Sequence, residues 1–146
     1  MNLEQLAALC RQAATDLAGR TAQRPVPATV VLPLPEATAV TTLEDFPDDD
    51  EGRFELLARF AADRMVPVNA PCFGFIAEAT LDDDGIPVDV VVCVWGARRR
   101  GAQLTAAPIT AEGVGEFVPP EPLDPTAMPF LAPLQHAADT AREAGP

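Results

Sequence analysis

The chain has 146 residues, about the length of one domain, so we expect a single domain spanning 1–146. Its formal net charge of −12 produces a field that repels phosphate backbones and anionic membrane surfaces, so we expect neither direct nucleic-acid binding nor membrane binding. The sequence contains no serine, lysine or tyrosine, which excludes a serine nucleophile, a lysine Schiff base and a tyrosine general acid.

The N-terminal segment predicts a helix over 2–18. Apolar residues recur there every three or four positions, which places them on one helix face. Asn2 is a suitable N-cap, and Gly19 suits the position after the last turn. Two short β-branched runs follow, at 30–32 and 40–43, and each predicts a short strand.

A second helix is predicted at about 51–65. The acidic run Asp48–Glu51 places negative charge where the N-terminus of a helix favours it. An apolar stripe that includes Phe54, Leu57 and Met65 then gives this helix a face for the core.

The centre of the chain predicts a β-hairpin at about 72–95. Residues 72–81 alternate between apolar and other side chains, and Gly85 in the segment DDDGIP allows a tight turn. The segment VDVVVCVW barely alternates, which indicates a strand buried on both faces. A third strand is predicted at 103–109, after the turn GARRRG.

Residues 112–134 contain six prolines in 23 positions, which excludes a regular helix or a central strand. The segment also carries several large apolar residues, so we expect an extended arm that lies on the body of the protein. The predicted fold is α+β: an antiparallel sheet of three to five strands, the helices at 2–18 and 51–65 packed on one face, and this proline-rich C-terminal arm.

The three cysteines are an odd number and form no C-x-x-C motif, which is typical of a reduced cytoplasmic protein with buried thiols. The only histidine, His136, is far from all of them in the sequence, so we predict neither a catalytic pair nor a metal site. All ten basic residues are arginine, a composition that favours a bacterial source with a GC-rich genome. We predict no cofactor and no catalytic residue.

Acidic residues support two alternative functions. Glu78 lies in the middle of a predicted strand, and with an arginine it defines a candidate small-ligand-binding or enzymatic domain. The runs at 48–51 and 82–84 define a candidate regulator that mimics a nucleic acid. Neither run completes the calcium-binding loop pattern.

The turn that contains Arg98, Arg99 and Arg100 is the main candidate for a binding site, together with Trp95 just before it. Arginine binds carboxylates in a bidentate geometry, so these residues suit an acidic partner. The acidic turn at 82–84 lies at the other end of the same strand, which favours contact between two copies over contact within one. We therefore predict a non-enzymatic cytoplasmic binding or adaptor protein that forms a homodimer or binds another protein. In size, charge and element order the chain resembles bacterial secretion chaperones, although no motif carries this resemblance.

Overall fold

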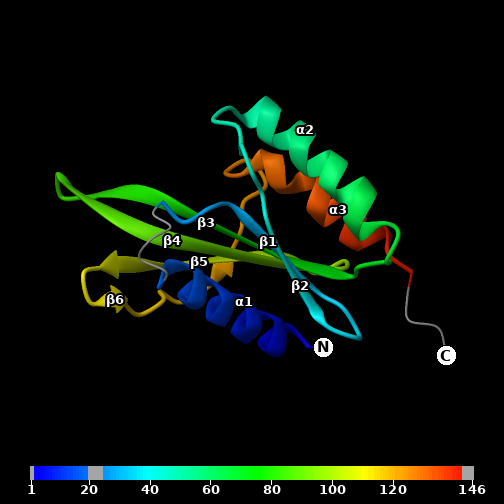
Figure 1. Ribbon diagram of the computed structural model, residues 1–146, viewed down its shortest axis with the longest axis horizontal. Helices are drawn as coiled ribbons and strands as arrows, with labels where there is room; N and C mark the ends of the chain where they lie inside the picture. Colours follow the sequence, from blue (N-terminus) through cyan, green and yellow to red (C-terminus); the bar gives the residue numbers. More distant parts are fainter. Residues whose placement is uncertain (1, 20–24, 143–146) are drawn as a thin grey trace.

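The computed structural model describes residues 2–19 and 25–142, so part of the domain predicted for 1–146 lies outside the described residues. The fold is α+β, with an antiparallel sheet between helices (Figure 1). The helical elements are α1 (Leu3–Ala18), α2 (Asp50–Phe60), the π-helical turn η1 (Ala61–Met65), the 3₁₀ turn η2 (Pro129–Leu131) and α3 (Ala132–Thr140). The strands are β1 (Thr29–Pro33), β2 (Thr38–Thr42), β3 (Cys72–Asp83), β4 (Ile86–Ala97), β5 (Gly101–Thr110), β6 (Gly113–Val114) and β7 (Glu121–Pro122).

The sheet is larger than the sequence predicted. It has seven strands, in the order β2-β1-β3-β4-β5-β6, with β7 paired to β5. The prediction of three to five strands was therefore too low. The two strands that were missed, β6 and β7, lie in the proline-rich segment and are two residues long. Such short pairings need few backbone N–H groups, so nearby prolines do not prevent them.

Both predicted long helices are present, and their first turns show why they start where they do. The Asn2 side chain accepts a hydrogen bond from the Gln5 backbone N–H at 2.8 Å, and the Gln5 side chain accepts one from the Asn2 N–H at 2.9 Å. This reciprocal pair is a capping box. Helix α2 is capped by Asp49, which accepts from the Gly52 N–H at 3.1 Å.

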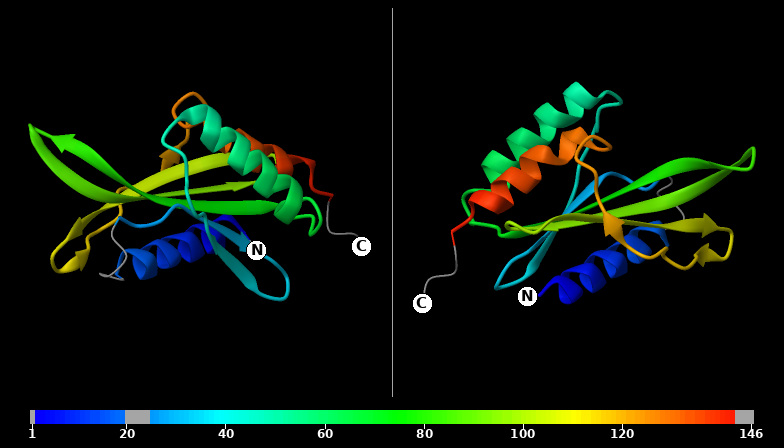
Figure 2. Two further views of the ribbon diagram at one scale, coloured as in Figure 1. Left: turned by 45° about the horizontal axis from the view of Figure 1, so that its top comes forward. Right: turned by 180° about the vertical axis from the view of Figure 1, so that it is seen from behind.

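The two helices do not share a face of the sheet, which corrects the prediction. Helix α1 packs in a cluster with Val31, Ile76 and Val91, whereas α2 and α3 pack in another with Val30 and Phe73. Residues 30 and 31 are neighbours in one strand, so their side chains point to opposite faces. Figure 2 shows α1 on one side and the α2–α3 pair on the other. The strand at 88–95 is apolar on both faces, so each face requires its own cover.

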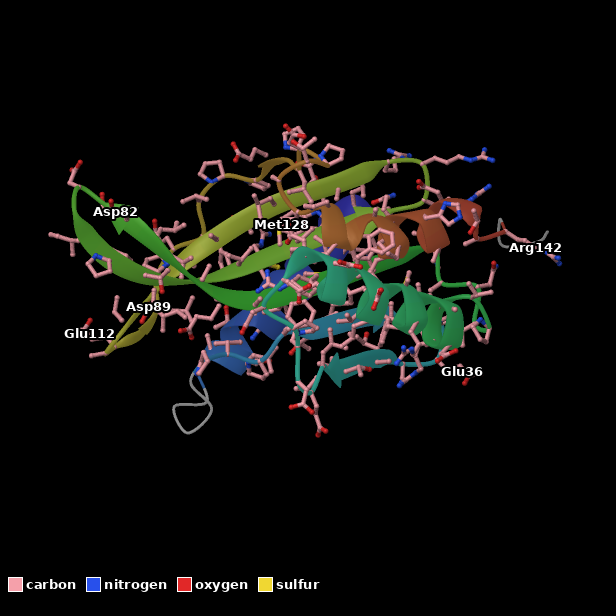
Figure 3. All side chains as sticks on the ribbon, turned by 90° about the horizontal axis from the view of Figure 1, so that it is seen from above. Glu36, Asp82, Asp89, Glu112, Met128 and Arg142 are labelled. Carbon is pink, nitrogen blue, oxygen red and sulfur yellow. The ribbon has the colours of Figure 1, made fainter. Side chains whose placement is uncertain are left out.

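The β3–β4 hairpin sets the long dimension of the sheet. Its turn is formed by Asp84 and Gly85, whose φ angles of 51° and 84° match the positive values of the favoured two-residue turn. The opposite end of β4 leads into the arginine turn. Figure 3 shows Asp82 and Arg142 at opposite ends of the molecule, with Met128 between them.

Residues 112–134 make several backbone contacts with β5. The Val118 N–H donates to the Ala106 carbonyl at 3.0 Å, and the Leu123 N–H donates to the Ala102 carbonyl at 2.9 Å. The Thr105 hydroxyl also donates to the Val118 carbonyl. These contacts place residues 118–123 beside β5.

Candidate functional site: two open grooves

The arginine turn is held in place by hydrogen bonds to two other parts of the chain. The Arg98 N–H donates to the Pro71 carbonyl at 2.8 Å. The Arg99 N–H donates to a carboxylate oxygen of Asp139 in α3, also at 2.8 Å. Arg99 has a φ of 58°, in the left-handed region, which brings the backbone round toward β5. The turn is thus tied to the loop before β3 and to α3.

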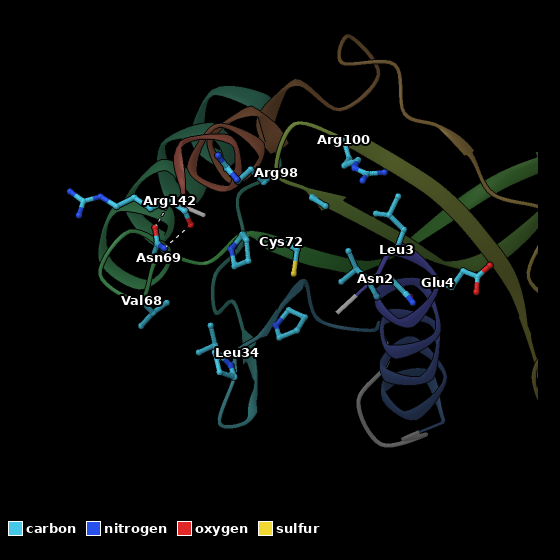
Figure 4. Close-up of a pocket in the computed structure, with 15 residues that line it drawn as sticks. Asn2, Leu3, Glu4, Leu34, Val68, Asn69, Cys72, Arg98, Arg100 and Arg142 are labelled. Atoms are coloured by element: carbon cyan, nitrogen blue, oxygen red, sulfur yellow. Dashed lines mark hydrogen bonds between the residues drawn. The ribbon is translucent and has the colours of Figure 1, made fainter. Parts of the chain in front are cut away.

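Arg98 and Arg100 line an open groove of about 970 Å³, which we call the arginine groove. The groove lies between the start of α1, the β1–β2 turn and the loop before β3 (Figure 4). Its remaining walls are mostly apolar and include Leu3, Leu34 and Val68. The complete lining is Asn2, Leu3, Glu4, Leu6, Pro33, Leu34, Pro35, Val68, Asn69, Pro71, Cys72, Ala97, Arg98, Arg100 and Arg142.

Arg142 borders the arginine groove mainly through its backbone. Its N–H donates to the Asn69 side-chain oxygen at 2.7 Å, and its carbonyl accepts from the Asn69 side-chain N–H at 3.0 Å. Figure 4 shows its side chain pointing away from Arg98 and Arg100. The cations of the turn that line the groove are therefore Arg98 and Arg100, and Glu4 is the one acid among its described lining residues.

The structure separates the other residues that the sequence singled out. Trp95 is only 3% exposed and packs in the core cluster beneath α1, so it is not displayed on the surface. Arg99 is exposed but does not line the arginine groove. Glu78 accepts a hydrogen bond from the Val26 N–H at 3.1 Å and borders a different groove.

That second groove, which we call the aromatic groove, has a volume of about 980 Å³ and lies on the α2–α3 side of the sheet. The rings of Phe46, Phe75 and Phe130, which line this groove, meet with centroid separations of 5.8–6.1 Å. The Arg53 guanidinium lies 5.2 Å from the Phe46 ring centroid and 5.3 Å from that of Phe130. Its Nε also donates to the Pro47 carbonyl at 2.7 Å.

The sequence did not predict the aromatic groove, because its walls come from segments far apart in the chain. Its lining draws on residues 25–28, 43–53, 75–81, 92, 104–106, 118–121, 128 and 130. Alternation along β3 indicated one apolar face. Only the tertiary structure shows that α2 and α3 leave part of that face open.

The three cysteines, distant in sequence, gather in the core cluster beneath α1. Cys10, Cys72 and Cys93 are all buried there with free thiols. Burial raises the pKa of the Cys72 thiol. A hydrogen bond with Cys10, together with burial, raises the pKa of Cys93. The raised pKa values keep the thiols of Cys72 and Cys93 protonated, which opposes nucleophilic attack and metal binding by these two residues.

The described residues contain no group of three or more histidine, cysteine, aspartate or glutamate side chains placed to hold a metal ion. No helix in the described part of the chain is long and apolar enough to cross a membrane. Comparison of the chain with known protein families, curated proteins and solved structures found no match.

Proposed function

We propose that this chain is a non-enzymatic cytoplasmic binding or adaptor protein, and that the arginine groove holds its partner. The observation that carries the proposal is the pairing of Arg98 and Arg100 with apolar walls in one open groove, on a chain whose net charge is −12. Guanidinium groups bind carboxylates, and apolar walls bind aliphatic side chains. The partner segment should therefore be acidic and apolar at once.

The tip of the β3–β4 hairpin has this chemistry. It carries three consecutive acids, Asp82–Asp84. The apolar residues that flank them, Leu81 and Ile86, are 53% and 65% exposed. The tip of a second copy is thus the partner segment that the chain itself supplies.

The distance between the hairpin tip and the arginine groove favours a contact between two copies of the chain over a contact within one copy. Strand β4 has 12 residues and separates the tip from the arginine turn by about 36 Å of extended chain. Two copies arranged antiparallel would each place a tip in the other's groove. Such a pair has two identical contacts related by a two-fold axis, so the assembly closes as a dimer.

The proposal is tested by measuring molar mass with light scattering after size exclusion. We expect the native chain to run as a dimer and Arg98→Glu/Arg100→Glu to run as a monomer, because the groove would then repel the acidic tip. Raising the salt concentration should also weaken the native dimer, because the screening length falls from about 10 Å at 0.1 M salt to about 3 Å at 1 M and weakens the attraction between the tip and the groove.

The matched control is Arg59→Glu/Arg64→Glu, which makes the same charge change at two exposed helix positions. We expect this control to remain dimeric. Arg100→Glu alone, at an exposed position, provides a second variant that does not disturb the partly buried Arg98. A monomeric native chain, or equal dissociation of the control, would count against the proposal.

A further inference from the structure

We infer that the aromatic groove is a second docking site and that it takes a basic amphipathic segment of a partner protein. The two grooves share no lining residue, although Leu81 of the aromatic groove also flanks the hairpin tip that the proposed function places in a second copy. The inference extends the proposed adaptor role by giving the chain a surface for a second partner of opposite charge.

The first argument is the shape of the groove floor. The three central strands contribute mainly small side chains to the lining, which leaves room above the sheet for an occupant. The residues on the floor are Ala77, Ala79, Val92, Leu104 and Ala106. Figure 2 shows that α2 and α3 cover only one part of this sheet face and that the β3–β4 hairpin extends beyond them.

The second argument is the apolar character of the walls. The three phenylalanines form an aromatic part of the wall, and Met128 adds a flexible apolar side chain to it. Leu81 and Val118, which also line the groove, are 53% and 54% exposed. A groove of this kind accepts the apolar stripe of an amphipathic helix.

The third argument is charge. Asp48 and Glu121 line the aromatic groove at exposed positions, whereas Glu78, which also borders it, has its carboxylate engaged by the Val26 N–H. Arg53 is the one cation among the lining residues described, and its stacking on two rings makes it part of the wall. The excess of carboxylates favours an occupant whose polar face carries lysine or arginine.

The test uses a fluorescein-labelled synthetic peptide of about 14 residues, or four helical turns, with leucine at i, i+3, i+4 and i+7 and lysine on the opposite face. Binding is followed by fluorescence anisotropy. Two further peptides serve as controls: one has the same composition in an order without an apolar face, and one has glutamine in place of lysine. We expect the first peptide to bind and both controls to bind about ten-fold more weakly or not at all.

Two protein variants locate the site. Ala79→Arg places a long cationic side chain on the floor and should weaken peptide binding by about ten-fold or more. Thr80→Arg is the matched control, because it makes the same change on the other face of the same strand and at an exposed position. It should bind the peptide like the native chain. Circular dichroism and the thermal midpoint establish that both variants are folded.

Several outcomes would overturn the inference: no peptide binding, equal binding of the peptide without an apolar face, or equal weakening by both variants. Equal binding of the glutamine peptide would overturn the basic character of the partner. Light scattering separates this inference from the proposed function, because Ala79→Arg leaves the arginine groove and the hairpin tip unchanged. That variant should therefore keep the native mass while losing the peptide.

Discussion

At the scale of single residues, a close approach of α1 to the sheet depends on Gly74. A Cβ atom built at this position would lie 2.5 Å from the Cys10 Sγ atom and 3.2 Å from the Val31 Cβ atom. Helix α1 rests on β3 here because position 74 has no side chain. We expect Gly74→Ala to lower the free energy of unfolding by about 1–3 kcal/mol, as measured by urea denaturation.

The same contact provides its own control through a double-mutant cycle. Cys10→Ala removes the sulfur atom that the new methyl group would meet, so the double variant should lose less stability than the sum of the two single losses. Strictly additive losses, or a Gly74→Ala variant as stable as the native chain, would contradict this account of the α1–β3 contact. The pairing of Cys10 with Gly74 could not be predicted from the sequence, because they lie 64 positions apart on separate elements.

At the scale of elements, Asp49 fixes the start of α2 by accepting a hydrogen bond from the Gly52 N–H. We expect Asp49→Ala to lower the free energy of unfolding by about 1 kcal/mol, because that N–H loses its partner. Asp48→Ala removes the same charge one residue before the cap and should cost clearly less. Chemical denaturation of both variants measures the difference, and equal losses would show that charge rather than the cap is responsible.

Local pattern was sufficient to predict most elements. The capping residue and apolar spacing predicted α1, and the DDDG segment predicted the β3–β4 hairpin, whose turn the structure places at Asp84 and Gly85. Local pattern did not predict β6 and β7, because these two-residue strands form only by pairing with β5 in the folded chain. It also failed to assign α1 and α2 to opposite faces, although the strand at 88–95 already required cover on both. The aromatic groove depends on that assignment, so it could not be predicted either.

At the scale of the whole molecule, the fall of stability at alkaline pH reports how strongly the fold opposes ionisation of the buried thiols. The chain has no lysine and no tyrosine, so cysteines are the main side chains that titrate between about pH 8 and 10. The folded state raises the pKa of Cys72 and Cys93. Above the pKa of an unfolded thiol, the unfolded chain therefore loses protons that the folded chain keeps, and stability falls as the pH rises.

We expect the urea midpoint to be lower at about pH 10 than at about pH 8, and Cys72→Ala/Cys93→Ala to reduce this difference. Urea titrations of both proteins at the two pH values measure it. The variant will be less stable at both, so the comparison rests on the change with pH and not on the absolute midpoint. An equal fall with pH in both proteins would show that the thiols are not the cause.

The arrangement of charge also belongs to the whole molecule, because the acidic tip and the arginine turn lie at opposite ends of β4. The sequence predicted this separation from the positions of the two turns along one strand. It did not predict that Arg98 and Arg100 share a groove with apolar walls, which the fold assembles from α1, the β1–β2 turn and the loop before β3.

The most direct test of the account is a charge-exchange experiment on two variants followed by light scattering. Arg98→Glu/Arg100→Glu reverses the charge of the two arginine positions in the groove, and Asp82→Arg/Asp83→Arg reverses the charge of two positions at the hairpin tip. Each variant alone should be a monomer, because every tip would meet a groove of its own sign. An equimolar mixture should form a dimer, because both contacts then join opposite charges. A mixture that stays monomeric while the native chain is a dimer would contradict the placement of the tip in the groove.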